Sequence, residues 1–353
     1  MTAVLRRAGI WAARVFVLLT VTSLVGLTMG QRIAGDGWWW FELSRYLPYY
    51  WIALPCLAAL MLAFVLGRAW VALGVANLLL LAFVTTGFTW HAGAAIPDGA
   101  QRIRLMSYNI KAAQAMQRPG GVAALETEVR RHAPDIVVMQ DAHGLRVERA
   151  APAQVDGGAL FGLPYVHALG QYIVASRYPL RACTPGQIGF RNESHRYLRC
   201  DVDVEGHALT VVTAHFQSPR GGLSATRREG LEGADEWQQN YQDRLTQARA
   251  LARSLADIPR PLVVAGDLNA PESSPVVGTL LDTGLRDAFS SAGRGWGYTY
   301  GHTLKRAVAF LRIDHILVSA DIGVAATRVS DGTASDHRPV IADIILRRHL
   351  ASP

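Results

Sequence analysis

Three long uncharged stretches near the N-terminus limit what this chain can fold into. Residues 9–30 carry one charge, at Arg14, and residues 49–66 and 69–88 carry none. A helix needs about 20 apolar residues to cross the hydrocarbon core of a bilayer. We therefore predict three transmembrane helices, at about 9–30, 49–66 and 69–89, in a membrane anchor that covers residues 1–91. The alternative is a signal anchor followed by two helices buried in a core.

The residues that flank these stretches indicate an orientation in the lipid bilayer. Arg6, Arg7 and Arg14 favour a cytoplasmic N-terminus, although the positive charges of the later loops are nearly balanced. The aromatic run from Trp38 to Phe41 is typical of the membrane–water interface. Three crossings would place the rest of the chain outside the cytoplasm. A short linker rich in Gly, Ala and Pro is expected at residues 92–101.

The pattern changes at Arg102 to short apolar segments that are separated by turn signals. Strands are expected at 103–108, 135–140, 172–175, 198–204, 208–214, 262–265, 313–318 and 340–346, and helices at 121–132 and 243–256. Alternating strands and helices predict an α/β fold with at least one large sheet. We assign residues 102–349 to this domain.

Polar residues recur at the ends of these expected strands. They are Asn109, Asp141, His215, Asp267, Asn269, Asp314, Asp336 and His337. Strand ends in an α/β fold can converge on one cleft, and buried carboxylates in such a cleft need a partner, of which a divalent cation is the simplest. Because these candidate ligands are rich in oxygen and include no Cys, they favour Mg²⁺ or Mn²⁺ over Zn²⁺.

Five motifs, taken in order, carry a family resemblance. They are Ser107-Tyr108-Asn109-Ile110, Gln140-Asp141, Gly266-Asp267-Leu268-Asn269, Ile313-Asp314-His315-Ile316 and Ser335-Asp336-His337-Arg338-Pro339. The chain resembles the endonuclease/exonuclease/phosphatase superfamily, which includes DNase I-like nucleases, neutral sphingomyelinases and inositol polyphosphate phosphatases. The resemblance implies a four-layer α/β sandwich, in which helices flank two packed mixed sheets. It also implies hydrolysis of phosphate esters or anhydrides.

The resemblance implies catalytic roles for five motif residues. Asp267 would orient and activate the attacking water, and Asn269 would contact the phosphate. His337 would stabilise the scissile phosphate while Asp314 holds its ring. His215 would help to protonate the leaving group. Individually, these residues also fit plainer roles, such as turn capping by Asp267 and Asn269.

Three further residues would form the metal side of the site. The resemblance implies that Asn109 and Asp141 hold the metal and that Asp336 is a further ligand of the metal or of a water. Position 141 departs from the family, which has Glu after this Gln. Because Asp is one methylene shorter, Asp141 would bind through water or need a shifted strand.

Two arginines are expected to bind substrate. Arg220 lies in a long insertion, residues 217–242, that directly follows His215 and reads as a substrate-binding loop or as a solvated surface loop. Arg312 lies two residues before Asp314 and either lines the cleft or packs in the core.

We therefore predict a membrane-anchored, metal-dependent phosphoesterase, whose location favours a lipid-linked substrate such as a phospholipid or a polyprenyl pyrophosphate. Membrane-anchored family members linked to glycopeptide resistance have a similar layout. An extracytoplasmic nuclease is an alternative that the formal net charge of +7 permits, but no aromatic and basic stacking surface is evident. The departure at Asp141 leaves a non-catalytic membrane scaffold as a third interpretation.

Two cysteines of the α/β domain could indicate whether this domain lies in an oxidising compartment. Cys183 and Cys200 lie near the ends of two neighbouring expected strands. They could form a disulfide if this part is extracytoplasmic, or they could remain thiols.

Overall fold

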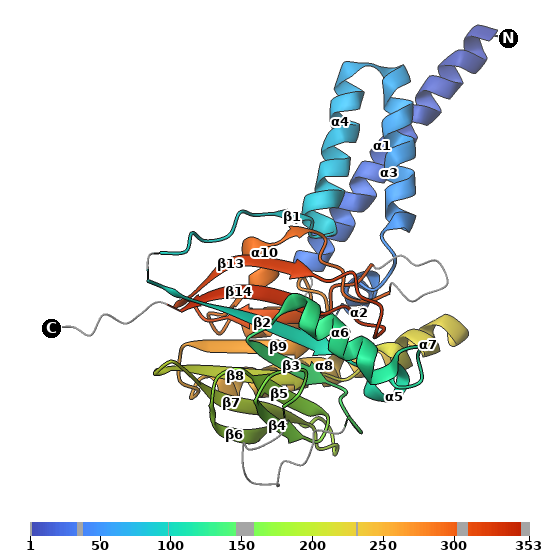
Figure 1. The fold of residues 1–353 in the computed structure, drawn as a ribbon. Coiled ribbons are helices and arrows are strands. Elements are labelled where there is room, and N and C mark those ends of the chain that lie inside the picture. Colours follow the sequence, from blue (N-terminus) through green and yellow to red (C-terminus); the bar gives the residue numbers. More distant parts are fainter. Residues whose placement is uncertain are drawn as a thin grey trace. The chain divides into compact units, whose positions relative to one another are not determined.

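The computed structural model describes residues 2–33, 38–97, 99–145, 159–230, 232–301 and 310–346. The chain divides into two compact units, Met1–Thr89 and Trp90–Pro353, and each is described by itself (Figure 1). Residue 98 of the expected linker and residues 347–349 of the expected domain lie outside the described residues.

Apolar helices form the N-terminal unit. They are α1 (Thr2–Ile33), α2 (Trp39–Ser44), α3 (Tyr50–Leu66), α4 (Arg68–Leu79) and the π-helical turn η1 (Leu80–Thr85). By length and composition, two stretches could cross a membrane, Val4–Ile33 and Arg68–Thr85, whereas Tyr50–Leu66 is shorter. A helix therefore occupies each predicted stretch, but the count of three spanning helices is not confirmed. Within their most apolar windows only 11% and 22% of the residues are buried, unlike a helix in the core of a soluble protein.

Two mixed six-stranded sheets form the centre of the C-terminal unit. The first has the order β13-β14-β2-β3-β5-β4 and contains β2 (Gln101–Asn109), β3 (Ile136–Gln140), β4 (Tyr165–Leu169), β5 (Tyr172–Ser176), β13 (Ile322–Val329) and β14 (Val340–Leu346). The second has the order β10-β12-β9-β8-β7-β6 and contains β6 (Leu180–Gln187), β7 (Arg196–Val204), β8 (His207–His215), β9 (Leu262–Asp267), β10 (Arg286–Asp287) and β12 (Asp314–Val318).

The sheets pack face to face and helices cover their outer faces, so the expected four-layer sandwich is confirmed (Figure 1). Side chains of alternate residues share the inner core, as Leu105 of the first sheet and Val211 of the second do. The outer face of the first sheet packs on α5 (Ala112–Ala115) and α6 (Gly121–His132). The outer face of the second packs on α8 (Ala234–Leu255) and α9 (Pro275–Leu281). Shorter elements are β1 (Thr89–Trp90), α10 (Ala288–Ala292) and β11 (Arg294–Gly295).

The expected loop at residues 217–242 is largely helical, which corrects the sequence-based interpretation. It contains α7 (Arg220–Glu229) and the first turns of α8. Trp237 anchors the segment because its side chain is completely buried. Gly222 of α7 makes this contact possible, since a Cβ there would lie 2.7 Å from the Cα of Trp237. The packed helices hold Arg220 in place at the start of α7.

A disulfide joins Cys183 of β6 to Cys200 of β7. The two residues are directly opposite each other in the antiparallel register, with their Cα atoms 4.1 Å apart. The bond links neighbouring strands, and Cys56 of the N-terminal unit is a buried free thiol.

Candidate active site

Strand directions bring the candidate catalytic residues to one edge of the sandwich. In the second sheet β8 and β9 are parallel, and their last residues, His215 and Asp267, are register partners. Because β12 runs antiparallel to β9, its first residue, Asp314, lies opposite Asp267. In the first sheet β2 and β3 are parallel and end together at Asn109 and Gln140.

Asp267 is the centre of this arrangement and is 1% exposed. Its Oδ2 accepts a hydrogen bond of 2.8 Å from Asn109 Nδ2, which comes from the other sheet. The same oxygen lies 3.6 Å from His215 Nε2 and 3.7 Å from His337 Nε2. Its Oδ1 accepts the backbone N–H of Asn269 at 2.9 Å. One buried carboxylate therefore faces two imidazole rings and is oriented by two donors.

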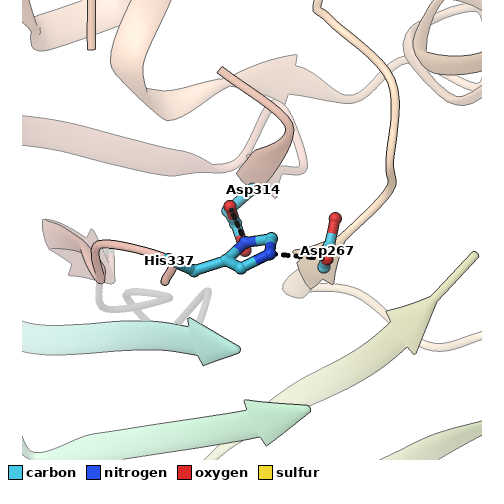
Figure 2. Close-up of side chains that lie close together, drawn as sticks. All are labelled: Asp267, Asp314 and His337. Atoms are coloured by element: carbon cyan, nitrogen blue, oxygen red, sulfur yellow. Dashed lines mark hydrogen bonds and ion pairs between the residues drawn. The ribbon is translucent and has the colours of Figure 1, made fainter. Parts of the chain in front are cut away.

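His337 and Asp314 form a hydrogen-bonded pair beside it, as Figure 2 shows. His337 Nδ1 donates to Asp314 Oδ2 at 2.8 Å, so Nε2 points toward Asp267. Burial alone would lower the pKa of His337, but the charges of Asp314 and then Asp267 outweigh it and raise the pKa to about 9. The ring is therefore cationic at neutral pH. Asp314 Oδ1 is buried and has no hydrogen-bond partner among the described residues.

His215, on the other side of Asp267, has a different partner. Its Nδ1 lies 2.6 Å from Gln171 Oε1, and its backbone N–H donates to the Tyr172 hydroxyl at 3.0 Å. Burial lowers the pKa of His215 to about 4, and the nearby carboxylate of Asp267 only partly opposes this. The ring is therefore neutral at pH 7, with its proton on Nδ1. The predicted proton-donor role would require His215 to take up a proton first.

Each of the two carboxylates predicted on the metal side is paired with a basic side chain. Lys111 Nζ lies 2.9 Å from Asp141 Oδ2, and Arg220 Nη2 lies 2.9 Å from Asp336 Oδ2. Burial acts to raise the pKa of Asp141, but the Lys111 ammonium outweighs it and holds that pKa below its usual range. Asn109 Oδ1 accepts the N–H of Lys111 at 3.2 Å.

The donor set suits a hard divalent cation. Amide and carboxylate oxygens predominate, and the unpartnered Asp314 Oδ1 is an acceptor that a cation or its water could satisfy. Ligand atoms of Asp267, Asp314 and His337 also lie within 4.8 Å of one another, but a cationic His337 has no free lone pair, so only the two carboxylates of this group could coordinate a metal. This group differs from the predicted set of Asn109, Asp141 and Asp336.

Asn269 and the two arginines occupy distinct environments. Asn269 has a left-handed backbone, with φ of 50°, and its Nδ2 donates to Phe216 O at 2.9 Å, which ties the turn after β9 to the residue after β8. Arg220 Nη2 also contacts the Tyr300 hydroxyl at 3.0 Å, and the Tyr300 ring lies 5.0 Å from that of His337. Arg220 therefore reaches the edge of the site.

Arg312 is turned toward a separate buried cluster. Its Nη1 donates to Asp287 Oδ2 at 2.8 Å, and its Nη2 pairs with Glu272. His315 Nδ1 lies 2.8 Å from the same Asp287 oxygen. These contacts support packing, the second of the two roles considered for Arg312, and they tie the start of β12 to β10.

Sequence reasoning missed two residues of the site, and for a third it favoured a packing role. Gln171 and Lys111 precede or follow strand ends but belong to no motif, so no pattern singled them out. Tyr172 begins the expected strand at 172–175, where its position near the motifs suggests that it lines the cleft or, more simply, packs. Its hydroxyl donates to Arg196 O at 2.7 Å and accepts from His215, which joins three strands of both sheets.

The two packed sheets and the group of a carboxylate and two histidines at their edge agree with a hydrolase acting on phosphoester bonds, the class to which the matching family model assigns the chain. The model of the endonuclease/exonuclease/phosphatase family matches residues 106–337, and the chain belongs to this family. Enzymes of this family generally use divalent metal ions. The carboxylates of Asp267 and Asp314 offer oxygen ligands for such an ion.

The chain is similar to several solved structures. A family protein from Bacteroides thetaiotaomicron has a TM-score of 0.50 at 15% identity and covers 70% of this chain and 99% of its own. A family protein from Beutenbergia cavernae has a TM-score of 0.48 at 23% identity and covers 70% of this chain and 72% of its own. A 3'-5' exonuclease from Neisseria meningitidis has a TM-score of 0.48 at 19% identity and covers 68% of this chain and 98% of its own. No curated protein matches the chain.

Proposed function

We propose that the protein is a membrane-anchored, Mg²⁺-dependent phosphoesterase whose substrate is lipid-linked, either a phospholipid or a polyprenyl pyrophosphate. The observation that carries the hydrolytic part is the Asp267 carboxylate held between a cationic His337 and a neutral His215. A neutral and a charged imidazole on one carboxylate suit a reaction in which negative charge develops on a phosphoryl group.

Each residue has a defined part in this reaction. Asp267 Oδ2 accepts a hydrogen bond from the attacking water and orients it. His337 donates from Nε2 to a phosphate oxygen, and Asp314 keeps the ring charged and fixed. Asn109, Asp141 and Asp336 would hold Mg²⁺, which when bound offsets charge on the phosphate and lowers the pKa of bound water. As the water attacks phosphorus, Asp267 takes up the proton that the water loses, and the neutral His215, whose Nε2 lies 3.6 Å from the same carboxylate oxygen, receives that proton and passes it to the leaving oxygen as the phosphorus–oxygen bond breaks.

The membrane location has two supports. The helices Val4–Ile33 and Arg68–Thr85 are apolar enough to cross a bilayer, and a tethered enzyme meets mainly substrates at the bilayer surface. The Cys183–Cys200 disulfide fits an oxidising compartment, which agrees with a catalytic unit outside the cytoplasm. A reporter enzyme fused after Pro353 tests this orientation. If its activity is found only on the cytoplasmic side, the orientation is wrong.

Substrate panels test the activity. The full chain in neutral detergent is incubated with a polyprenyl pyrophosphate, a phospholipid or plasmid DNA, each with Mg²⁺, with Mn²⁺ or with EDTA. We expect product from a lipid substrate with a divalent ion and none with EDTA. Cleavage of DNA alone would refute the lipid-linked substrate, and no hydrolysis in any arm would favour the scaffold.

Asp267→Asn is the decisive variant. We expect kcat to fall about a thousandfold, because the group that orients the water loses its charge. The matched control is Asp282→Asn, which removes an exposed carboxylate at the end of α9 and should leave kcat unchanged.

A further inference from the structure

A cavity with a volume of about 690 Å³ lies in the C-terminal unit. Its walls are α10, the segment 294–298, β13 with the residues that follow it, and the start of the unit at His91. Asp267, Asp314 and His337 are not among the described residues that line it, and Arg338 connects the two sites along the chain. The volume is typical of a small-molecule site.

One wall comes from the segment that the sequence suggested was only a linker. His91 N–H donates to Gly293 O at 3.1 Å, and Ala94 N–H donates to Val324 O at 2.7 Å. Between them Gly93 has a φ of +75°, and a Cβ at this position would lie 2.0 Å from Ala325 O. Only glycine allows so close an approach, so this wall is pinned to β13.

The lining has an excess of positive charge. Arg294, Arg328 and Arg338 line the cavity, and Asp331 is the one carboxylate among the described lining residues. That carboxylate is 85% exposed and pairs with Arg131 at 2.6 Å.

Arg328 lacks an ion-pair partner within the part of the chain that the structure describes. Asp343, whose charge acts on Arg328, is already shared by Arg104 at 2.7 Å and Arg102 at 3.6 Å. Burial and then the Arg104 cation hold the pKa of Arg328 below its usual range, which shows that its charge is poorly compensated. Arg338 Nε is buried and has no hydrogen-bond partner among the described residues.

An aromatic surface adjoins these cations. The rings of Trp296 and Tyr298 stack with centroids 6.1 Å apart and planes 15° apart, and Trp296 is 43% exposed. Arg294 lies over the Trp90 ring at 5.3 Å. An aromatic plane beside guanidinium groups can hold an organic group that is attached to an anion.

We propose that this cavity is a second ligand site, separate from the catalytic centre, which binds a phosphate group carrying a small organic substituent. Arg328 and Arg338 contact the phosphate, and Trp296 contacts the substituent. A phospholipid headgroup and a soluble phosphate ester share this chemistry, so the experiment distinguishes the two sources.

Calorimetric titration of the full chain in neutral detergent and EDTA tests this site. One arm uses glycerol 3-phosphate and the other uses dihexanoyl phosphatidylglycerol. Arg328→Gln should weaken binding about tenfold, because one charge-assisted contact to phosphate is lost. Arg328→Gln should fold, because it removes a half-buried cation that lies near the cations of Arg104 and Arg102. Thermal unfolding of the variant checks this. Arg253→Gln, at an exposed position on α8, is the matched control and should bind as the unaltered protein does.

The outcomes separate the two sources and the two sites. Similar affinities in both arms indicate a soluble phosphate ester, and binding of the lipid alone indicates a headgroup. His337→Gln should retain the binding that Arg328→Gln weakens. The proposal is overturned if neither probe binds, if Arg328→Gln behaves as Arg253→Gln does, or if His337→Gln rather than Arg328→Gln loses the binding.

Discussion

The two histidines beside Asp267 lie at nearly the same distance from its carboxylate and have opposite pKa shifts. His337 Nε2 lies 3.7 Å and His215 Nε2 lies 3.6 Å from the same oxygen. The Nδ1 of His337 meets the Asp314 carboxylate, whereas that of His215 meets the Gln171 amide. The Asp314 carboxylate stabilises the imidazolium of His337, whereas at His215 burial prevails over the Asp267 carboxylate and the Lys111 cation adds to its effect, so one pKa is about 9 and the other about 4.

Among substitutions of the residues that contact these two histidines, Asp314→Asn should have the largest effect, because it gives His337 an amide partner like that of His215. We expect the pKa of His337 to fall and kcat at pH 7 to fall about a hundredfold, since the cation beside the phosphate is lost. NMR titration of the ring and steady-state kinetics measure the two effects. Asp282→Asn is again the control, and an unchanged His337 pKa would show that Asp314 does not hold the charge.

Gln171→Glu is the reverse exchange, since it gives His215 a carboxylate partner. The pKa of His215 should rise, so the acidic limb of the pH profile should move to higher pH. As a result, kcat at pH 7 should fall about tenfold. If the acidic limb stays where it is in the unaltered protein, Gln171 does not set the protonation of His215.

The two histidines should also have opposite effects on how the free energy of unfolding depends on pH, measured in EDTA. His337 has a folded pKa above the unfolded value of about 6.5, so its stabilisation is complete below that pH and is lost as the pH rises through about 9. His215 has a lowered pKa, so stability is lost as the pH falls from about 6.5 through about 4. Urea unfolding across this range should show a maximum near pH 6.5. His337→Gln should flatten only the alkaline side.

Tyr172→Phe should have the smallest effect. It removes the hydroxyl that accepts the His215 N–H and donates to Arg196 O, and about 1 kcal/mol of the free energy of unfolding should be lost. We expect kcat to fall only a few-fold, because the His215 ring keeps Gln171. A loss of kcat as large as that of Asp314→Asn would mean that the backbone of β8, and not the ring partner, controls His215.

The best-predicted elements have a clear periodic pattern. The helix at residues 121–132 and the strands that end at Asn109, Gln140, His215 and Asp267 were predicted because they alternate or are continuously apolar. The strands β4, β10 and β13 were missed, and all three lie at the ends of their sheets. In β13, intermediate burial interrupts the apolar pattern. The helical packing of residues 217–242 was missed because it depends on the long-range contact between Gly222 and Trp237.

The sequence by itself determined the family, the two-part chain and the residues with the chemistry for phosphoester hydrolysis, because motifs and apolar runs are local properties. Only the tertiary structure decided what each of those residues does. Asp314 and Gln171 are 23 and 44 positions from the histidines that they contact, and no spacing rule relates them. Arg312 lies two residues from Asp314 yet turns to Asp287, while Arg220 reaches Asp336 across 116 positions. Protonation, pairing and charge depend on distances in space, which strand pairing and packing set.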